Sequence, residues 1–396
     1  MPIGGAKAGF FAAGVANENY FGDESLGNCQ FGASAITQTG DSTAIDTVLT
    51  TGSESGGPGS SSYGTGTAQT IPYSSAVYEF TVANQSGTYD GDMVVLNFID
   101  LIVDGSLTLT TQRPCRGMLV YCSGDCTLNG YISMSSRGGH ADPTTSGGGD
   151  SSAVSSTGIR LPLFTSSGSQ TLAAADFAGC GTAAVAAVAN QDGISSNGTI
   201  FTMTQVGGAG GSSNAAGGAA GQTGGTTIGT GGGACGKGTD SQFGRGGDGG
   251  AFSGGAGGGG ARHASATNGQ DYGGAGGNAG VGGSGEGIGP GIGNPGGSGY
   301  SVTTTNGIGG IVWLVVKGDL TIGAAGGVVA DSPKGYGSSH YNGGGAGGGS
   351  IFVLYAGTLS NSGVIEAQGG PSGSAGHNHY GGTGGEGGTH SMQIDD

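Results

Sequence analysis

Short runs of apolar residues bounded by glycine recur along this chain. Three of them share one pattern: an apolar run, then a glycine, then a second short apolar stretch. They cover residues 118–132 (MLVYCSGDCTLNGYI), 311–322 (IVWLVVKGDLTI) and 351–365 (IFVLYAGTLSNSGVI). Runs of this length between glycines are typical of β-strands. A looser stretch, 93–109, precedes them and alternates apolar with polar positions.

The three units align on one glycine each, at positions 124, 318 and 357. This alignment matches two cysteines with apolar residues of the other units: Cys122 with Val316 and Tyr355, and Cys126 with Leu320 and Leu359. Repetition of this kind predicts stacked strand units, each burying its face on the next. The apolar counterparts favour two buried thiols over a disulfide between Cys122 and Cys126, which stays open as the alternative.

Glycine accounts for 100 of the 396 residues and is concentrated in residues 207–300. The tracts there keep no strict Gly-X-Y period, and proline is only 10 in the chain, which excludes collagen. Glycine has no side chain to bury, so hydrogen bonds between extended polyproline-II rods would have to order such a segment. We therefore predict a polyglycine-II rod bundle over 207–300. The alternative is an irregular glycine loop held by neighbouring chains.

These patterns predict an all-β fold of repeated short strand units plus a glycine-rich rod bundle, with almost no helix. The one helical candidate, 173–189, is interrupted by Gly179 and Gly181. We expect five regions: an N-terminal attachment region and linker (1–70), a β-rich module (71–140), a variable insertion (141–206), the polyglycine-II bundle (207–300), and a second β-rich module with a glycine-rich C-terminal tip (301–396).

Charge and hydrophobicity argue against two kinds of partner, nucleic acid and the membrane interior. The formal net charge is −16, from 26 acidic and 10 basic residues, which argues against nucleic-acid binding. No apolar run approaches the roughly 20 residues that span a bilayer, so we expect no membrane insertion. The apolar stretch 8–16 is short and rich in small residues, and it does not predict a conventional leader peptide.

Two motifs resemble a known family. Residues 20–27 read YFGDESLG, and residues 100–139 read DLIVDGSLTLTTQRPCRGMLVYCSGDCTLNGYISMSSRGG. Followed by glycine tracts, this order resembles glycine-rich bacteriophage tail-fibre and tail-tip proteins, including adhesins built on polyglycine-II tracts. Glu24 and Leu26 depart from the family's usual opening. The resemblance implies a virion protein that is assembled in the host cytoplasm and recognises the host surface.

The sequence carries no pattern that predicts catalysis. It has no HExxH motif and no convincing nucleophile elbow. Residues 231–238 (GGGACGKG) come close to a phosphate-binding loop but end in glycine and lack the strand and helix that such a loop joins. We therefore expect a non-enzymatic protein without a cofactor.

Aromatic and histidine residues that interrupt the glycine tracts are the candidates for binding. Rigid rods whose loops carry tyrosine and short polar residues would present a preorganised surface to sugars. The candidate receptor-binding residues are Phe243, Tyr272, Tyr336, His340, Tyr341, His377, His379 and Tyr380. These rings could instead seal the ends of the rods. His377 and His379 are also weak candidates for a metal site shared by three chains on a threefold axis.

The leading hypothesis is a phage tail fibre or tail-tip adhesin that binds a host glycan or outer-membrane component. We expect a homotrimer that contacts other virion proteins through its N-terminal region. One alternative is a purely structural virion protein, such as a head fibre, capsid decoration or tail spacer, without a ligand. A second alternative is a host extracellular fibre or an ice-binding polyglycine protein.

Overall fold

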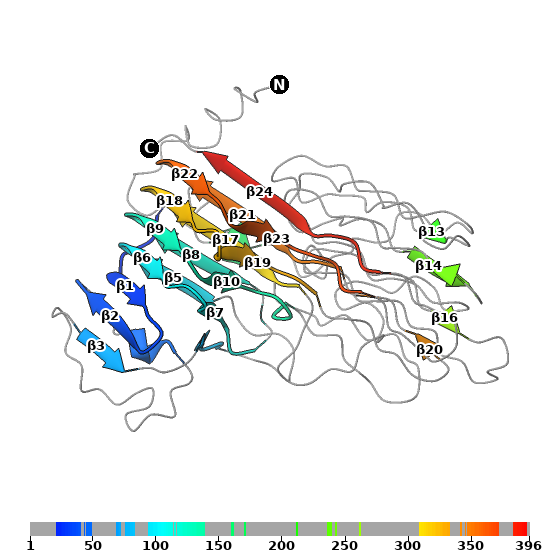
Figure 1. Ribbon diagram of the computed structural model, residues 1–396, viewed down its shortest axis with the longest axis horizontal. Coiled ribbons are helices and arrows are strands. Elements are labelled where there is room, and N and C mark those ends of the chain that lie inside the picture. The colour runs from blue at the N-terminus through cyan, green and yellow to red at the C-terminus, as the bar shows by residue number, and fades with distance from the viewer. Residues whose placement is uncertain are drawn as a thin grey trace.

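The computed structural model describes residues 21–40, 43, 45–49, 69–72, 76–83, 94–113, 115, 117–138, 309–332, 345, 347–371 and 383–393, together with short strands between 160 and 342 (Figure 1). These residues form β-strands and connecting turns, with a single turn of 3-10 helix, η1 (Ile45–Thr47), and no α-helix. The predicted all-β class is therefore confirmed for the described part of the chain.

Four consecutive coils of the chain each contribute one strand to each of three sheets. The coils are β5 (Val94–Phe98), β6 (Leu101–Val103) and β7 (Thr108–Thr111); β8 (Met118–Cys122), β9 (Cys126–Leu128) and β10 (Tyr131–Ser133); β17 (Ile311–Val316), β18 (Leu320–Ile322) and β19 (Gly327–Val329); and β21 (Ser350–Tyr355), β22 (Leu359–Asn361) and β23 (Val364–Glu366). A final strand, β24 (Gly388–Gln393), begins another coil.

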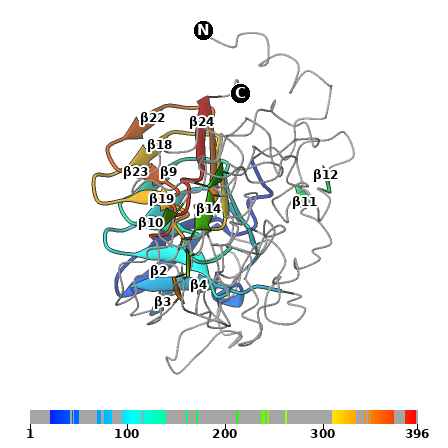
Figure 2. The same cartoon turned by 90° about the vertical axis from the view of Figure 1, so that its right-hand side faces the viewer.

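Strands of successive coils pair in parallel, which makes the molecule a three-faced β-solenoid (Figures 1 and 2). We name each sheet by the strand that residues 118–133 give it. The β8 sheet has the order β24-β21-β17-β8-β5, the β10 sheet has the order β23-β19-β10-β7-β4, and the β9 sheet contains β22-β18-β9-β6 followed by three N-terminal strands.

The register of these sheets confirms the predicted repeat. Val316 pairs with both Cys122 and Tyr355 in the β8 sheet. Leu320 pairs with both Cys126 and Leu359 in the β9 sheet. The looser stretch forms the preceding coil. Strands from 71–140 and from 301–396 thus share all three sheets. For example, β8 and β17 are direct neighbours although residues 123–310 separate them in the sequence.

Apolar side chains fill the interior between the three sheets. Leu96, Val120, Leu314 and Val353 lie in one row across the β8 sheet, and all four belong to the buried core. Full burial of a side chain of this size stabilises the fold by roughly 1.5–3 kcal/mol. The row explains why each coil needs its apolar positions at the same place.

The β8 sheet is buried on its outer face as well. Every residue of β8 and β17 is buried, which accounts for their uninterrupted apolar sequences. On the outer face, the Trp313 and Phe352 rings meet edge to face with centroids 4.8 Å apart. The His390 ring stacks on Phe352 at 5.6 Å.

An antiparallel cap closes the N-terminal end of the solenoid. β1 (Asn28–Phe31) pairs in parallel with β6, β2 (Ala35–Thr39) pairs antiparallel with β1, and β3 (Gln69–Pro72) pairs antiparallel with β2 at the edge of the β9 sheet. β4 (Val77–Phe80) adds to the β10 sheet beside β7. The Phe31 ring contacts three aromatic rings edge-on, and these belong to Tyr78, Phe80 and Phe98.

Residues 22–27 of the opening motif lie against the first two coils. Gly22 packs on Asn97 and Tyr121, and the Leu26 N–H donates to the Asn97 carbonyl at 2.8 Å. Glu24 and Leu26 have contrasting environments. Glu24 has a φ of 60°, where glycine is favoured, whereas the Leu26 side chain is buried in the core. Within the region expected to be an attachment segment, residues 26–39 are therefore part of the solenoid.

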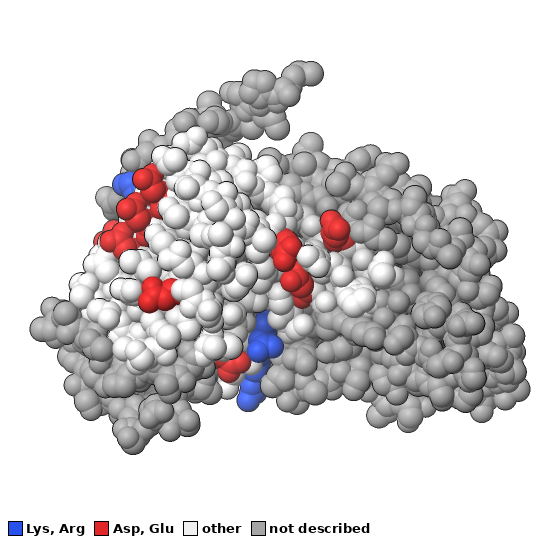
Figure 3. All heavy atoms as spheres, in the orientation of Figure 1, with Lys and Arg blue, Asp and Glu red and all other residues white. Residues whose placement is uncertain are grey.

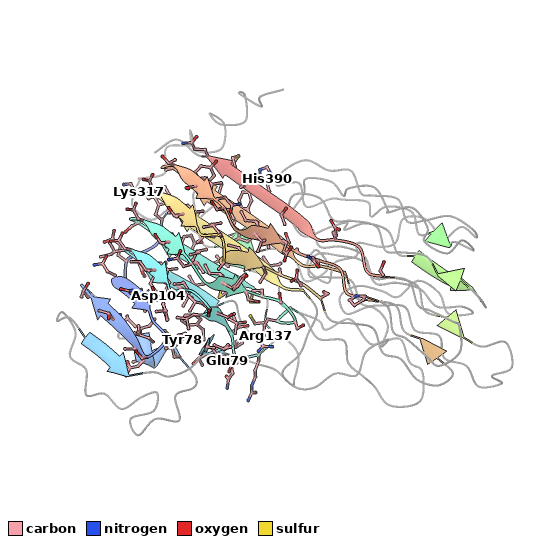
Figure 4. The ribbon with its side chains drawn as sticks, viewed as in Figure 1. Tyr78, Glu79, Asp104, Arg137, Lys317 and His390 are labelled. Carbon is pink, nitrogen blue, oxygen red and sulfur yellow. The ribbon has the colours of Figure 1, made fainter. Side chains whose placement is uncertain are left out.

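A ladder of aspartates stacks at the corner between the β8 and β9 sheets, which we call the aspartate corner. Asp100 accepts the Asp125 N–H at 2.8 Å, Asp125 accepts the Asp319 N–H at 2.8 Å, and Asp319 accepts the Thr358 N–H at 2.7 Å. A line of carboxylates follows the edge of the molecule in Figure 3, beside Lys317, which Figure 4 labels. Each carboxylate thus fixes the same corner of the next coil.

Candidate functional site

The three sheets meet at three corners, and in the described coils the long connections all cross the same corner. The aspartate corner and the corner between the β9 and β10 sheets are crossed by only a few residues in every described coil. The corner from the β10 sheet to the β8 sheet is crossed by residues 112–117, 134–310, 330–349 and 367–387. We call it the loop corner. The short strands β13, β14, β16 and β20, which belong to two of these connections, lie together at one end of the molecule (Figure 1).

Three glycine tracts, from the two connections 330–349 and 367–387, pack together at the loop corner. The Gly348 N–H donates to the Gly385 carbonyl at 2.9 Å, and the Gly384 N–H donates to the Gly370 carbonyl at 2.9 Å. None of these residues belongs to a β-strand. Backbone groups of these non-strand tracts therefore satisfy one another.

The close approach of these tracts requires glycine. A Cβ on Gly345 would overlap the carbonyl oxygen of Gly370, and a Cβ on Gly348 would overlap that of Ala367. A Cβ on Gly387 would overlap the Gly349 carbonyl in the same way. Here the side-chain hydrogen of glycine is what lets neighbouring backbones come within hydrogen-bonding range.

Polar side chains anchor the base of the connections. The Ser332 hydroxyl accepts the Gly309 N–H at 2.6 Å and donates to the Gly347 carbonyl, so it joins the end of connection 134–310 to both ends of connection 330–349. At the preceding residue, the Asp331 carboxylate accepts the Gln368 N–H at 2.6 Å, and the Asp331 N–H donates to Ser135 at 2.9 Å. Consecutive coils are thus tied together where the loops begin.

The environment of Asp331 raises the pKa of its carboxyl group. Burial is the main cause, and the nearby Glu366 charge adds to it, while the Gln368 N–H opposes both. Asp331 joins connection 330–349 to connection 367–387, so the stability of this anchor should depend on pH.

At the far end of the connections, segments from two loops meet. β16 (Ala261–Arg262) pairs antiparallel with β20 (Tyr341–Asn342), which sets Arg262 opposite Tyr341. β15 (Gln242–Phe243) pairs with β14 (Gly236–Thr239), which in turn pairs with β13 (Gly211–Ser212). Short strands from the glycine-rich region and from connection 330–349 therefore lie together at this end (Figure 1). β11 (Arg160–Leu161) and β12 (Gln170–Thr171) form a separate pair.

The structure places two of the predicted binding residues in these strands. Phe243 ends β15 and Tyr341 begins β20. The other candidates, Tyr272, Tyr336, His340, His377, His379 and Tyr380, lie outside the described residues. The metal hypothesis for His377 and His379 therefore stays a prediction, and no group of three or more metal-ligating side chains occurs among the described residues. Cys122 and Cys126 are both reduced and buried.

Two features, one at the loop corner and one on the β8 sheet, were missed from the sequence. The anchors Ser332, Asp331 and Gln368 carry no motif of their own. The outer face of the β8 sheet also holds a buried Tyr121 hydroxyl without a hydrogen-bond partner, and burial raises its pKa. The uninterrupted apolar run 311–316 was the available signal that this sheet is covered on both faces.

Side chains on the β10 sheet mark the other side of the loop corner. The Arg137 guanidinium contacts Glu79 at 3.2 Å and donates from Nε to the Thr111 carbonyl at 2.7 Å (Figure 4). This pair ties β4, β7 and the end of β10 together just before connection 134–310 begins. It is partly exposed, so its electrostatic contribution is modest.

Comparison with known proteins gives no relative: no family model, no curated protein and no solved structure matches the chain. Among the described residues there is no helix of the length and apolarity needed to cross a membrane.

Proposed function

We propose that this protein is a bacteriophage tail-fibre or tail-tip adhesin that binds a host-surface glycan without catalysing a reaction. The observation that carries the proposal is the loop corner. The coils stack in register, their long, glycine-rich connections join the β10 sheet to the β8 sheet at one corner, and β13, β14, β16 and β20 of these connections lie at one end of the molecule. Such an arrangement separates a shaft from a variable contact surface, and binding residues are commonly carried on loops that a rigid scaffold positions.

The glycine tracts support a second part of the proposal. We infer that the packing of tracts 345–349, 367–371 and 383–387 continues outward as a polyglycine-II bundle that includes residues 207–300. Glycine rods hold one another through their backbones, so residues at their far ends can change without loss of a core. The pairing of Arg262 with Tyr341 across two connections supports a contact surface built from several loops.

The chemistry of the candidate residues favours a sugar ligand. Tyrosine offers a large, rigid face for stacking at low entropic cost, and short polar residues bond hydroxyl groups. The proposal includes a homotrimer in the virion, attached to other virion proteins through the N-terminal region. Light scattering of the purified chain measures the mass that tests the trimer.

Binding to cells tests the adhesin. The fluorescently labelled full chain is applied to a panel of bacterial strains, with purified surface polysaccharides as competitors. In the test variant, Gly-Ser linkers replace 333–344 and 372–382, so that the anchor residues on either side remain. We expect the parent to stain at least one strain and the variant to lose the staining while keeping its thermal midpoint.

A matched variant separates the loop chemistry from loop length. Alanine at Tyr336, Tyr341, His377 and Tyr380 leaves both connections intact and should weaken staining at least tenfold. Undiminished staining by both variants would place the binding surface elsewhere. A parent that stains no strain would favour the ligand-free structural protein, and electron microscopy of the virion would then locate the chain on the capsid or along the tail.

A further inference from the structure

Among the four described cysteines, the thiols of Cys122 and Cys126 contact each other, whereas those of Cys29 and Cys115 contact backbone carbonyl groups. The Cys29 thiol donates to the Leu26 carbonyl at 3.3 Å, and the Cys115 thiol donates to the Gly117 carbonyl at 3.4 Å. The thiols of Cys122 and Cys126 instead hydrogen-bond to each other. Two sulfur atoms thus meet inside the solenoid.

The aspartate corner holds this thiol pair in place. Cys122 ends β8 and Cys126 begins β9, and both side chains belong to the buried core. The turn between them is fixed from the preceding coil, since the Gly124 N–H donates to Ile99 at 2.8 Å and Asp125 is bound by Asp100. It is also fixed from the following coil, where the Gly318 N–H donates to Gly124 at 2.9 Å.

No other described coil has this chemistry at the corresponding positions. The residues level with Cys122 and Cys126 are Phe98 and Leu101, Val316 and Leu320, and Tyr355 and Leu359. An apolar pair is therefore sufficient to fill this corner, and packing alone does not require sulfur at both positions.

We propose that Cys122 and Cys126 are an oxidisable pair that closes into a disulfide when the chain folds in the presence of a disulfide oxidant. Both S–H bonds break and one S–S bond forms between the two sulfur atoms. Two electrons and two protons pass to the oxidant, whose own disulfide is reduced to two thiols. A chain that folds under reducing conditions keeps the pair as thiols.

The same burial makes the folded pair inert. Desolvation raises the pKa of the Cys122 thiol well above its usual value, and the neighbouring Cys126, Asp100 and Cys29 add to the effect. Exchange requires a thiolate, so the folded, reduced protein should resist oxidation at neutral pH. The pair should react before the coil 311–329 stacks on it.

A single tryptic peptide reports the result. Cleavage after Arg116 and Arg137 releases residues 117–137, which contain Cys122 and Cys126 and no other cysteine. The full chain is unfolded with reductant, transferred to buffer with oxidised and reduced glutathione, refolded, alkylated under denaturing conditions and digested. We expect this peptide without alkyl groups and lighter by two hydrogens, and we expect both cysteines alkylated when oxidised glutathione is added only after folding.

Variants distinguish this pair from general oxidation. Cys122→Ser should leave Cys126 alkylated or bound to glutathione, whereas Cys115→Ser should leave the disulfide in 117–137 unchanged. Peptide 117–137 recovered with both cysteines alkylated after oxidative refolding, or joined to a peptide with Cys29, Cys180 or Cys235, would overturn the proposal. Mass spectrometry of the wild-type chain gives this answer even if a variant fails to fold.

Discussion

The aspartate corner and the loop corner join the same coils, yet the first has two or three residues in every described coil and the second varies greatly in length. At the aspartate corner, a carboxylate of one coil accepts a particular N–H of the next, directly before the strand of the β9 sheet begins. At the loop corner, the tracts contact one another through glycine backbone groups, which repeat along the chain. A corner held by specific side chains stays short, whereas one held by repeated backbone contacts can be extended.

Both corners depend on the apolar interior, and removal of part of it should have the largest effect. Leu314 is fully buried between Val120 and Val353. Leu314→Ala should lower the free energy of unfolding by about 2–5 kcal/mol, through lost burial and the cavity left behind. Chemical denaturation monitored by circular dichroism measures the change.

Thr321→Ala, on the exposed face of the β9 sheet, serves as the control and should change the free energy of unfolding by less than about 0.5 kcal/mol. Equal effects of the two substitutions would show that the interior is not the main source of stability. The hydrogen bonds at the two corners would then have to supply most of the stability.

The second prediction addresses the loop corner. Gly348→Ala places a Cβ against the Ala367 carbonyl, so neighbouring backbone must move at a cost of roughly 1–3 kcal/mol. The loss should be local: amide exchange should accelerate in 345–349 and 383–387, while β8 and β17 keep their protection.

Gly105→Ala is the matched control, because the nearest atom to its added Cβ is the Asn129 carbonyl oxygen at 3.8 Å. It should leave exchange unchanged throughout. Unchanged exchange in Gly348→Ala as well would mean that the tracts do not pack as closely in solution.

Much of the solenoid could be predicted from sequence, because one signal repeats in it. Aligning Gly124, Gly318 and Gly357 gave the register that the sheets adopt, since a coil must return each apolar residue to the same place in the core. The aspartates at 125 and 319 directly follow two of these glycines and were not used. They were a readable signal for the ladder.

The loop corner was harder to predict for a physical reason. Glycine tracts have no periodic side chains, so the sequence does not indicate which tract lies beside which. Stacking of the repeated units and an insertion after residue 140 were both predicted, but 71–140 and 301–396 were expected as two separate modules, whereas β8 and β17 are direct neighbours in one sheet. The anchors Asp331 and Ser332 act through contacts with other coils, and these contacts exist only once the coils stack.

The third prediction tests the constancy of the aspartate corner. Asp125→Ala removes the acceptor of the Asp319 N–H and should lower the free energy of unfolding by roughly 0.5–1.5 kcal/mol. Asp125→Asn keeps the Oδ1 acceptor and should restore most of the loss. If both variants are equally destabilised, the charge and not the hydrogen bond holds this corner, and added salt should then weaken the parent as well.

The smallest expected effect concerns the charge at the root of the loops. Because the pKa of Asp331 is raised, the folded state binds the proton more tightly than the unfolded state does. The contribution of this group to stability is therefore complete below the ordinary aspartate pKa of about 3.9 and is lost as the pH rises through the higher folded value. Asp331→Asn keeps an oxygen for the Gln368 N–H and removes the ionisation.

At pH 7 the Asp331→Asn variant should be more stable than the parent by a few tenths of a kcal/mol, since solvent screens this half-buried site. The gain should shrink to nothing near about pH 3.5, where the parent carboxyl is protonated in both states. Paired thermal melts across this pH range measure the difference. A gain that is independent of pH would mean that packing at the anchor, and not the charge, limits how tightly the loop corner holds its connections.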